Sequence, residues 1–175
     1  VAGMDLTGGP MDLSVTKEEL NVKGKARLAG MPVDFDWTKY FSQESPVAST
    51  LSASLDLDAP ALGKFGVPVS FAVSGTLPAK IEYTLKHDKS AALKLDGDIR
   101  PLGFSVPLIN FAKGAGVEGK IALTAALQDG KLQRVTGLNL SGGGIGVKGD
   151  IAFTHDGLGA LNVRKAAIRE FVLGA

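Results

Sequence analysis

Residues 20–37 read LNVKGKARLAGMPVDFDW, and this stretch decides the fold because apolar and polar residues alternate along it. The residues that share one side of its first half are Leu20, Val22, Gly24, Ala26 and Leu28. The residues that share one side of its second half are Met31, Val33, Phe35 and Trp37. A period of two places successive side chains on opposite faces of a strand. With Gly30 as a turn residue between the halves, the stretch predicts two antiparallel strands with a common apolar face.

The same alternation recurs along most of the chain. The other alternating segments are residues 11–16, 51–58, 69–73, 80–86, 91–95, 121–127, 138–140 and 151–153. Turn signals separate several of them, at residues 87–89, 96–97, 129–130 and 156–157. We therefore expect about ten to twelve short antiparallel strands, each near the usual length of about 5–6 residues. The predicted fold class is all-β, with a long, strongly curved antiparallel sheet forming a groove or an open sandwich, and at most one or two short helices.

Two segments do not fit a simple strand pattern. Residues 58–65 predict one or two helical turns, with Asp58 as the N-cap and Pro60 in the first turn. The stretch Arg164–Leu173 has the apolar spacing of a helix and also that of a strand, so its conformation stays open.

A short tetrad, Val-x-Gly-polar, occurs four times in strand-like surroundings. The copies begin at Val22, Val73, Val117 and Val147. A glycine inside a strand permits a bulge, a sharp bend or a close approach of another backbone. A sheet that bends along its length uses such glycines, whereas the bland alternative is that valine and glycine are common in this chain.

Composition bounds the class of protein. The 175 residues are 45% hydrophobic, carry a formal net charge of +1 and include no cysteine. The length fits one domain over residues 1–175, and we find no linker within it. Near-neutrality argues against a nucleic-acid partner, and the missing cysteines exclude a disulfide scaffold and a thiolate metal site. No apolar run reaches the length of a membrane helix. Because Val1 stands in place of an initiator methionine, we expect that the chain is processed or excised from a longer one.

The motifs that resemble catalytic or cofactor sites fail on context. Two matches to G-x-G-x-x-G, at residues 114–119 and 144–149, lead into strand patterns and not into the helix that a dinucleotide requires. His87 and His155 each precede an aspartate in an expected turn, and they supply too few ligands for a metal site. The Asp-x-Asp pairs match no calcium loop, and the pair around Gly97 is expected to lie in a turn. We expect no catalytic residue, no cofactor and no metal.

The remaining feature is the apolar strand face. It predicts either the core of an ordinary sandwich, with two sheets facing each other, or a half-open groove whose apolar floor holds acyl chains.

The order of the elements resembles a known family. The stretch 20–37, the segment from Leu62 to Thr76, the passage 110–120 and the passage 138–161 follow the pattern of AsmA-like proteins, in particular the YhdP/TamB-type large periplasmic proteins. The resemblance spans roughly residues 10–173 and depends on glycine, leucine and valine positions. It implies a segment of a much longer, repetitive envelope protein of a Gram-negative bacterium, anchored in the inner membrane by a part outside this chain.

The resemblance also implies a function without catalytic residues. We expect a periplasmic segment whose apolar concave sheet shields phospholipid or other acyl lipid, contributing to intermembrane lipid transport and outer-membrane integrity. Membrane contact would occur only through parts outside this chain. The expected lipid-binding residues are Leu28, Val33, Phe35, Trp37, Leu51, Leu55, Phe71, Val73, Tyr83, Leu93, Leu123 and Phe153. The alternative is a structural or partner-binding β-domain that stacks edge to edge with neighbouring segments of the same protein without binding lipid.

Overall fold

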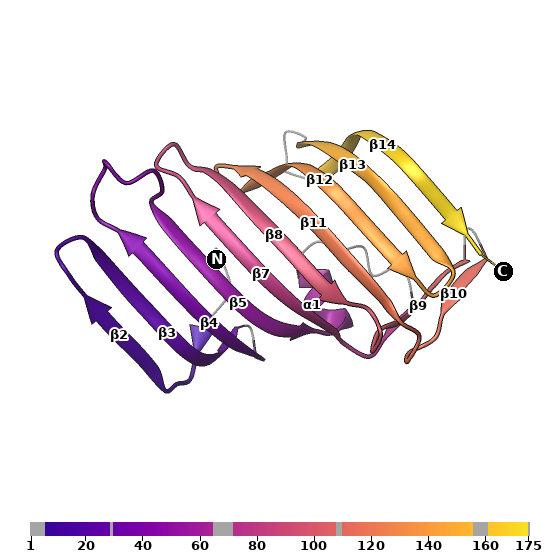
Figure 1. Ribbon diagram of the computed structural model, residues 1–175, viewed down its shortest axis with the longest axis horizontal. Helices are drawn as coiled ribbons and strands as arrows, with labels where there is room; N and C mark the ends of the chain where they lie inside the picture. Colours follow the sequence, from indigo (N-terminus) through magenta and orange to yellow (C-terminus); the bar gives the residue numbers. More distant parts are fainter. Residues whose placement is uncertain (1–5, 29, 65–71, 108–109, 156–160, 175) are drawn as a thin grey trace.

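The computed structural model describes residues 6–28, 30–64, 72–107, 110–155 and 161–174. Figure 1 shows a long, twisted sheet with a smaller layer behind part of it. The elements in chain order are β1 (Leu6–Thr7), β2 (Met11–Val15), β3 (Glu19–Leu28), β4 (Met31–Tyr40), β5 (Ser49–Leu57), α1 (Ala59–Lys64), β6 (Ala72–Ser74), β7 (Leu77–Leu85), β8 (Ser90–Asp98), β9 (Gly103–Val106), β10 (Phe111–Lys113), β11 (Gly119–Gln128), β12 (Lys131–Gly142), β13 (Ile145–His155) and β14 (Leu161–Leu173). The prediction of an all-β fold with at most one or two short helices is confirmed, since one short helix is present among the described residues.

The large sheet has eleven strands in the order β1-β3-β4-β5-β7-β8-β11-β12-β13-β14, with β2 also paired to β3. Every pairing in it is antiparallel. Strands β10, β9 and β6 form a second, three-stranded sheet. The chain therefore follows a meander that it leaves twice. After β5 it builds α1 and β6 before it returns with β7, and after β8 it builds β9 and β10 before it returns with β11. In Figure 1, α1, β9 and β10 lie behind one end of the central strands, and we call α1 and the three-stranded sheet together the cover.

The hydrophobic core lies between one end of the large sheet and this cover. Its buried members from the sheet include Val33, Phe35, Leu55 and Leu77, and Ala61 of α1 and Leu102 join them from the cover side. Asp58 caps α1 as predicted, since its Oδ1 accepts a hydrogen bond from the Ala61 N–H at 2.8 Å. The described helix is too short to cross a membrane.

The structure also settles or corrects several expectations about the strands. The C-terminal stretch is strand β14, paired along its length with β13. The central strands are longer than expected, nine to thirteen residues. Asp96 and Gly97 do not form the expected turn, because they lie inside β8 between β7 and β11. A side chain at Gly97 would meet Leu77 Cδ1 at 2.8 Å, so core packing explains this glycine. The expected turn at 156–157 lies outside the described residues.

The four glycines of the Val-x-Gly tetrads share one property, although not all lie within strands. Gly24 and Gly149 are inside strands, whereas Gly119 begins β11 and Gly75 follows β6. A Cβ at each would approach a backbone oxygen within contact distance: Pro10 O for Gly24, Pro101 O for Gly75, Ser141 O for Gly119 and Ala167 O for Gly149. Of the three explanations for a glycine inside a strand (a bulge, a sharp bend or a close approach of another backbone), the close approach therefore applies to all four.

Asp150 holds together three strands near the C-terminal edge. The pairing of β12 with β13 shifts register around Gly137, whose φ is +60°. The Asp150 carboxylate in β13 accepts a hydrogen bond from the Gly137 N–H at 2.9 Å. It also accepts two from the Arg169 guanidinium in β14, at 2.5 and 3.1 Å. The Gly137 N–H first, and the guanidinium next, hold the pKa of Asp150 below its ordinary value.

Replacing Asp150 by asparagine is expected to destabilise the C-terminal strands at neutral pH. A carboxyl whose pKa is lowered by folding stabilises the protein above its unfolded pKa, about 3.9, and this contribution is lost as the pH falls through the folded value. The stability difference between wild type and D150N in urea unfolding is therefore expected to shrink as the pH falls below about 5. The matched control is Asp56→Asn, an exposed carboxylate with no ion pair among the described residues. A D150N difference that did not change with pH would contradict this role.

Candidate functional site

Cross-strand register aligns the apolar residues of the large sheet into continuous rows on one face. One of these, which we call the transverse row, crosses eight strands from β4 to β14, and each residue is the direct partner of the next. Its members are Trp37, Leu51, Tyr83, Leu93, Ala125, Val135, Ile151 and Ala166. The alternation seen in the sequence thus becomes one apolar surface shared by all these strands.

One end of this surface belongs to the protein's own core. Three of the expected lipid-binding residues, Val33, Phe35 and Leu55, are buried there. Four more, Leu28, Trp37, Leu51 and Val73, are partly buried and pack against the core. Val73 lies on β6, so it is part of the cover and not of the sheet face beneath it. The cover therefore occupies the part of the surface that these residues form.

The other end of the surface is not part of this core. Tyr83, Leu93, Leu123 and Phe153 belong neither to the core cluster nor to the residues packed against it. All four are half-buried, and they lie on β7, β8, β11 and β13. We call this region, together with the half-buried Ile151 of the transverse row, the open face. Ala125 and Val135, which lie between Leu93 and Ile151 in that row, are buried. The remaining expected residue, Phe71, lies outside the described residues.

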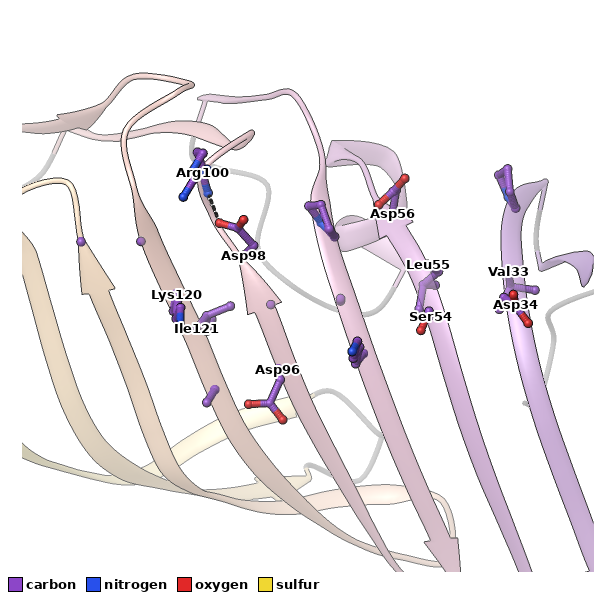
Figure 2. A pocket seen from close by; sticks show the side chains of 18 of the residues that line it. Val33, Asp34, Ser54, Leu55, Asp56, Asp96, Asp98, Arg100, Lys120 and Ile121 are labelled. Atoms are coloured by element: carbon purple, nitrogen blue, oxygen red, sulfur yellow. Dashed lines mark hydrogen bonds between the residues drawn. The ribbon is translucent and has the colours of Figure 1, made fainter.

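The opposite, polar face of the large sheet carries two hollows. The larger has a volume of about 1160 Å³ and crosses the strands from β3 to β12. Figure 2 shows Asp34, Asp56, Asp96 and Asp98 along it. Short side chains such as Ser54 and Ala122 form its floor. The sequence predicts a concave apolar face, whereas both of these hollows lie on the polar face.

Opposite charges alternate across the larger hollow. Its lining includes five acidic residues, Asp34, Asp56, Asp96, Asp98 and Glu118, and four basic ones, Lys25, Lys80, Arg100 and Lys120. Lys25 stands opposite Asp34 in the register, Lys80 opposite Asp96, and Lys120 opposite Asp98. Such cross-strand pairs favour one register over a slipped one. The charges of this hollow are thus explained by strand pairing.

The described residues contain no group of three or more His, Asp or Glu side chains that could hold a metal ion. The passage 114–119 leads into β11 and the passage 144–149 lies largely within β13, as the strand patterns predicted. In the part of the chain that the structure describes, no helix follows either of them. His87 lies in the turn between β7 and β8, where its Nε2 is buried without a hydrogen-bond partner. The side chain of His155 is not among those described.

Sequence reasoning missed the most buried charged side chain in the described structure. Lys113, on β10, is 3% exposed. Its Nζ donates hydrogen bonds to Ile99 O at 2.6 Å, Leu102 O at 2.8 Å and Gly114 O at 3.2 Å. Burial lowers the pKa of this lysine, and the Asp98 carboxylate opposes that shift. The sequence does contain a signal for this burial. Phe111 and Lys113 occupy alternate positions of one short strand, so the lysine shares a face with an apolar residue.

Searches against protein-family models, curated proteins and solved structures found no match. A proposal about the role of this chain therefore depends on the geometry described above.

Proposed function

We propose that this chain is a non-enzymatic, periplasmic segment of a larger envelope protein, whose apolar sheet face shields the acyl chains of phospholipid. In this role it contributes to lipid transport between membranes and to the integrity of the outer membrane. The observation that carries the proposal is the open face, an apolar surface of half-buried side chains that lie outside the core cluster.

The dimensions of the open face suit an acyl chain. The part of the transverse row that lies outside the core cluster runs from Tyr83 to Ala166 and crosses six strands, and thus five interstrand spacings. At about 4.8 Å each, they span about 24 Å. The hydrocarbon core of a bilayer is about 30 Å thick, so the chains of one leaflet reach about 15 Å. An extended acyl chain therefore fits along the row.

The chemistry of the open face also suits an acyl chain. Leu93 and Leu123 offer branched apolar surface, and Tyr83 adds an aromatic ring to the same face. Burial of apolar area is non-directional and is worth about 0.8 kcal/mol per CH₂ group. Such a surface holds a chain of methylene groups without directed polar contacts, which agrees with a role as a shield and not as an enzyme.

The test measures binding of a phospholipid with a fluorescent acyl chain to the purified chain. We expect saturable binding by the wild type and a loss of about tenfold or more in affinity for the double variant L93N/L123N, because two apolar side chains leave the contact. The matched control is A92N/T124N, whose positions neighbour the same residues in the same strands but face the polar side. Circular dichroism checks that each variant keeps its sheet.

Two results would overturn the proposal. One is a wild-type chain that binds no labelled phospholipid and carries none, by mass spectrometry, after gentle purification from an envelope fraction. The other is equal loss of binding in the test and control variants, which would show that the two faces of the sheet do not differ toward lipid.

A further inference from the structure

The two edges of the large sheet expose apolar side chains. At one edge, β2 carries Leu13 and Val15 with 66% and 60% of their surface exposed. At the other, β14 carries Val163 and Phe171 at 64% and 55%. Within the described residues, β14 pairs only with β13 and β2 only with β3. A long edge strand with unpaired N–H and C=O groups and apolar side chains is a template for pairing with another strand.

We propose that β14 of one copy of this chain pairs with β2 of a second copy, so that large sheets join head to tail. The inference goes beyond acyl-chain shielding and does not depend on it, because it concerns the strand edges and not the open face. Three features of the described residues favour this occupant: strand direction, the placement of apolar side chains, and charge.

Strand direction allows the sheet to continue. The path from β2 to β14 contains ten strands joined by nine antiparallel pairings. Nine is odd, so β2 and β14 run in opposite directions. A second copy placed beside the first without turning it over therefore brings β2 antiparallel to β14, the pairing used throughout the large sheet.

The apolar side chains lie on the same face at both edges. Leu13 is the direct partner of Val22, which pairs with Trp37 of the transverse row. At the other edge, Phe171 is the partner of Val147, which pairs with Leu140 on the apolar face. Joining the edges in this orientation makes the apolar surface continuous from one copy to the next.

The charges of the two edges are opposite. Residues 11–18, which contain β2 and the turn after it, carry Lys17 against Asp12 and Glu18, so their sum is 1 − 2 = −1. Strand β14 carries Arg164, Lys165 and Arg169 against Glu170, so its sum is 3 − 1 = +2. Within the described residues, neither Arg164 nor Lys165 takes part in an ion pair. Pairing of β14 with β14 would bring like charge together, whereas β14 with β2 joins opposite charge.

The absence of cysteine from the sequence permits a clean crosslinking test. The variants are Ser14→Cys in β2 and Ala167→Cys in β14, treated with a short bismaleimide. We expect a ladder of covalent multimers from the double variant, a dimer from a mixture of the two single variants, and monomer from either single variant alone. A covalent dimer from Ala167→Cys alone would show β14–β14 pairing and overturn the inference. Monomer under every condition would overturn it as well.

A charge swap tests the electrostatic part of the inference in the otherwise unaltered chain. R164E/K165E is expected to weaken self-association in sedimentation velocity by about tenfold. Mixing it with D12K/E18K is expected to restore association between the two variants, since each then offers the other an edge of opposite charge. Failure of the mixture to associate more than either variant alone would count against head-to-tail pairing. Binding of labelled phospholipid by the non-associating variants separates this outcome from the proposed function.

Discussion

Replacing Ile99 by alanine is expected to lower the free energy of unfolding by about 2–5 kcal/mol. Ile99 is 2% exposed and is the largest fully buried side chain among the described residues. It directly follows β8, and its N–H donates to Gly119 O at 3.0 Å. A Cβ at Gly119 would stand 2.7 Å from Ile99 Cδ1, so the isoleucine fills the space that this glycine leaves. The alanine variant opens a cavity between the large sheet and the cover.

Urea unfolding of the chain checks this prediction, with two controls that separate packing from general sensitivity. Ile99→Val removes one methylene group and is expected to cost about 0.5–1.5 kcal/mol. Val163→Ala, at a position that is 64% exposed, is expected to change stability by less than about 0.5 kcal/mol. A loss below about 1 kcal/mol for I99A would mean that the cover does not pack tightly on the sheet.

Local sequence patterns predicted much of the fold because strands and caps are local. The alternation in residues 20–37 became the hairpin of β3 and β4, and Asp58 became the N-cap of α1. The stretch Arg164–Leu173 stayed open because its spacing suits both a helix and a strand. The neighbour decides between them, since the side chains of β14 follow the register of β13 through two shifts. A single sequence shows no such partner.

Long-range arrangement was harder to predict for a physical reason. The departure after β8 that builds β9 and β10 depends on contacts between segments far apart in the chain, such as the pairing of Val73 with Phe104. The sequence predicts a turn at Gly97, yet this glycine lies inside β8 and leaves room for Leu77 within the core. A glycine that permits a turn and a glycine that permits close packing look the same in a sequence.

The sequence indicated on which face of the large sheet a candidate residue lies, but not whether the cover lies above that residue. Period-two alternation placed Val33 and Tyr83 on one face of the large sheet, and the register bears that placement out. Alternation carries no information about what lies above a face. Val33 is consequently in the core, whereas Tyr83 is on the open face. The same limit explains why the polar hollows were not expected.

Replacing Lys113 by methionine is expected to cost about 1–3 kcal/mol, because methionine keeps the apolar stem but cannot donate hydrogen bonds. Ile99 O would keep the Leu102 N–H at 3.2 Å, whereas Leu102 O and Gly114 O would lose the ammonium. The stem itself packs beneath the turn between β12 and β13, since a Cβ at Gly143 would meet Lys113 Cγ at 2.8 Å. Lys113 thus joins β10 of the cover to the end of β8, and the exposed Lys120→Met is the control, with less than about 0.5 kcal/mol expected.

The pH dependence of the same variant distinguishes the charge of Lys113 from its packing. Burial lowers its pKa in the folded chain, so over the window between that value and the unfolded value of about 10.4 the unfolded chain binds the additional proton. Stability contributed by this group therefore rises with pH across that window. The difference in free energy of unfolding between wild type and K113M is expected to grow as the pH rises toward about 10.4. A difference that stayed constant would show that the ammonium keeps its proton through the three carbonyl contacts.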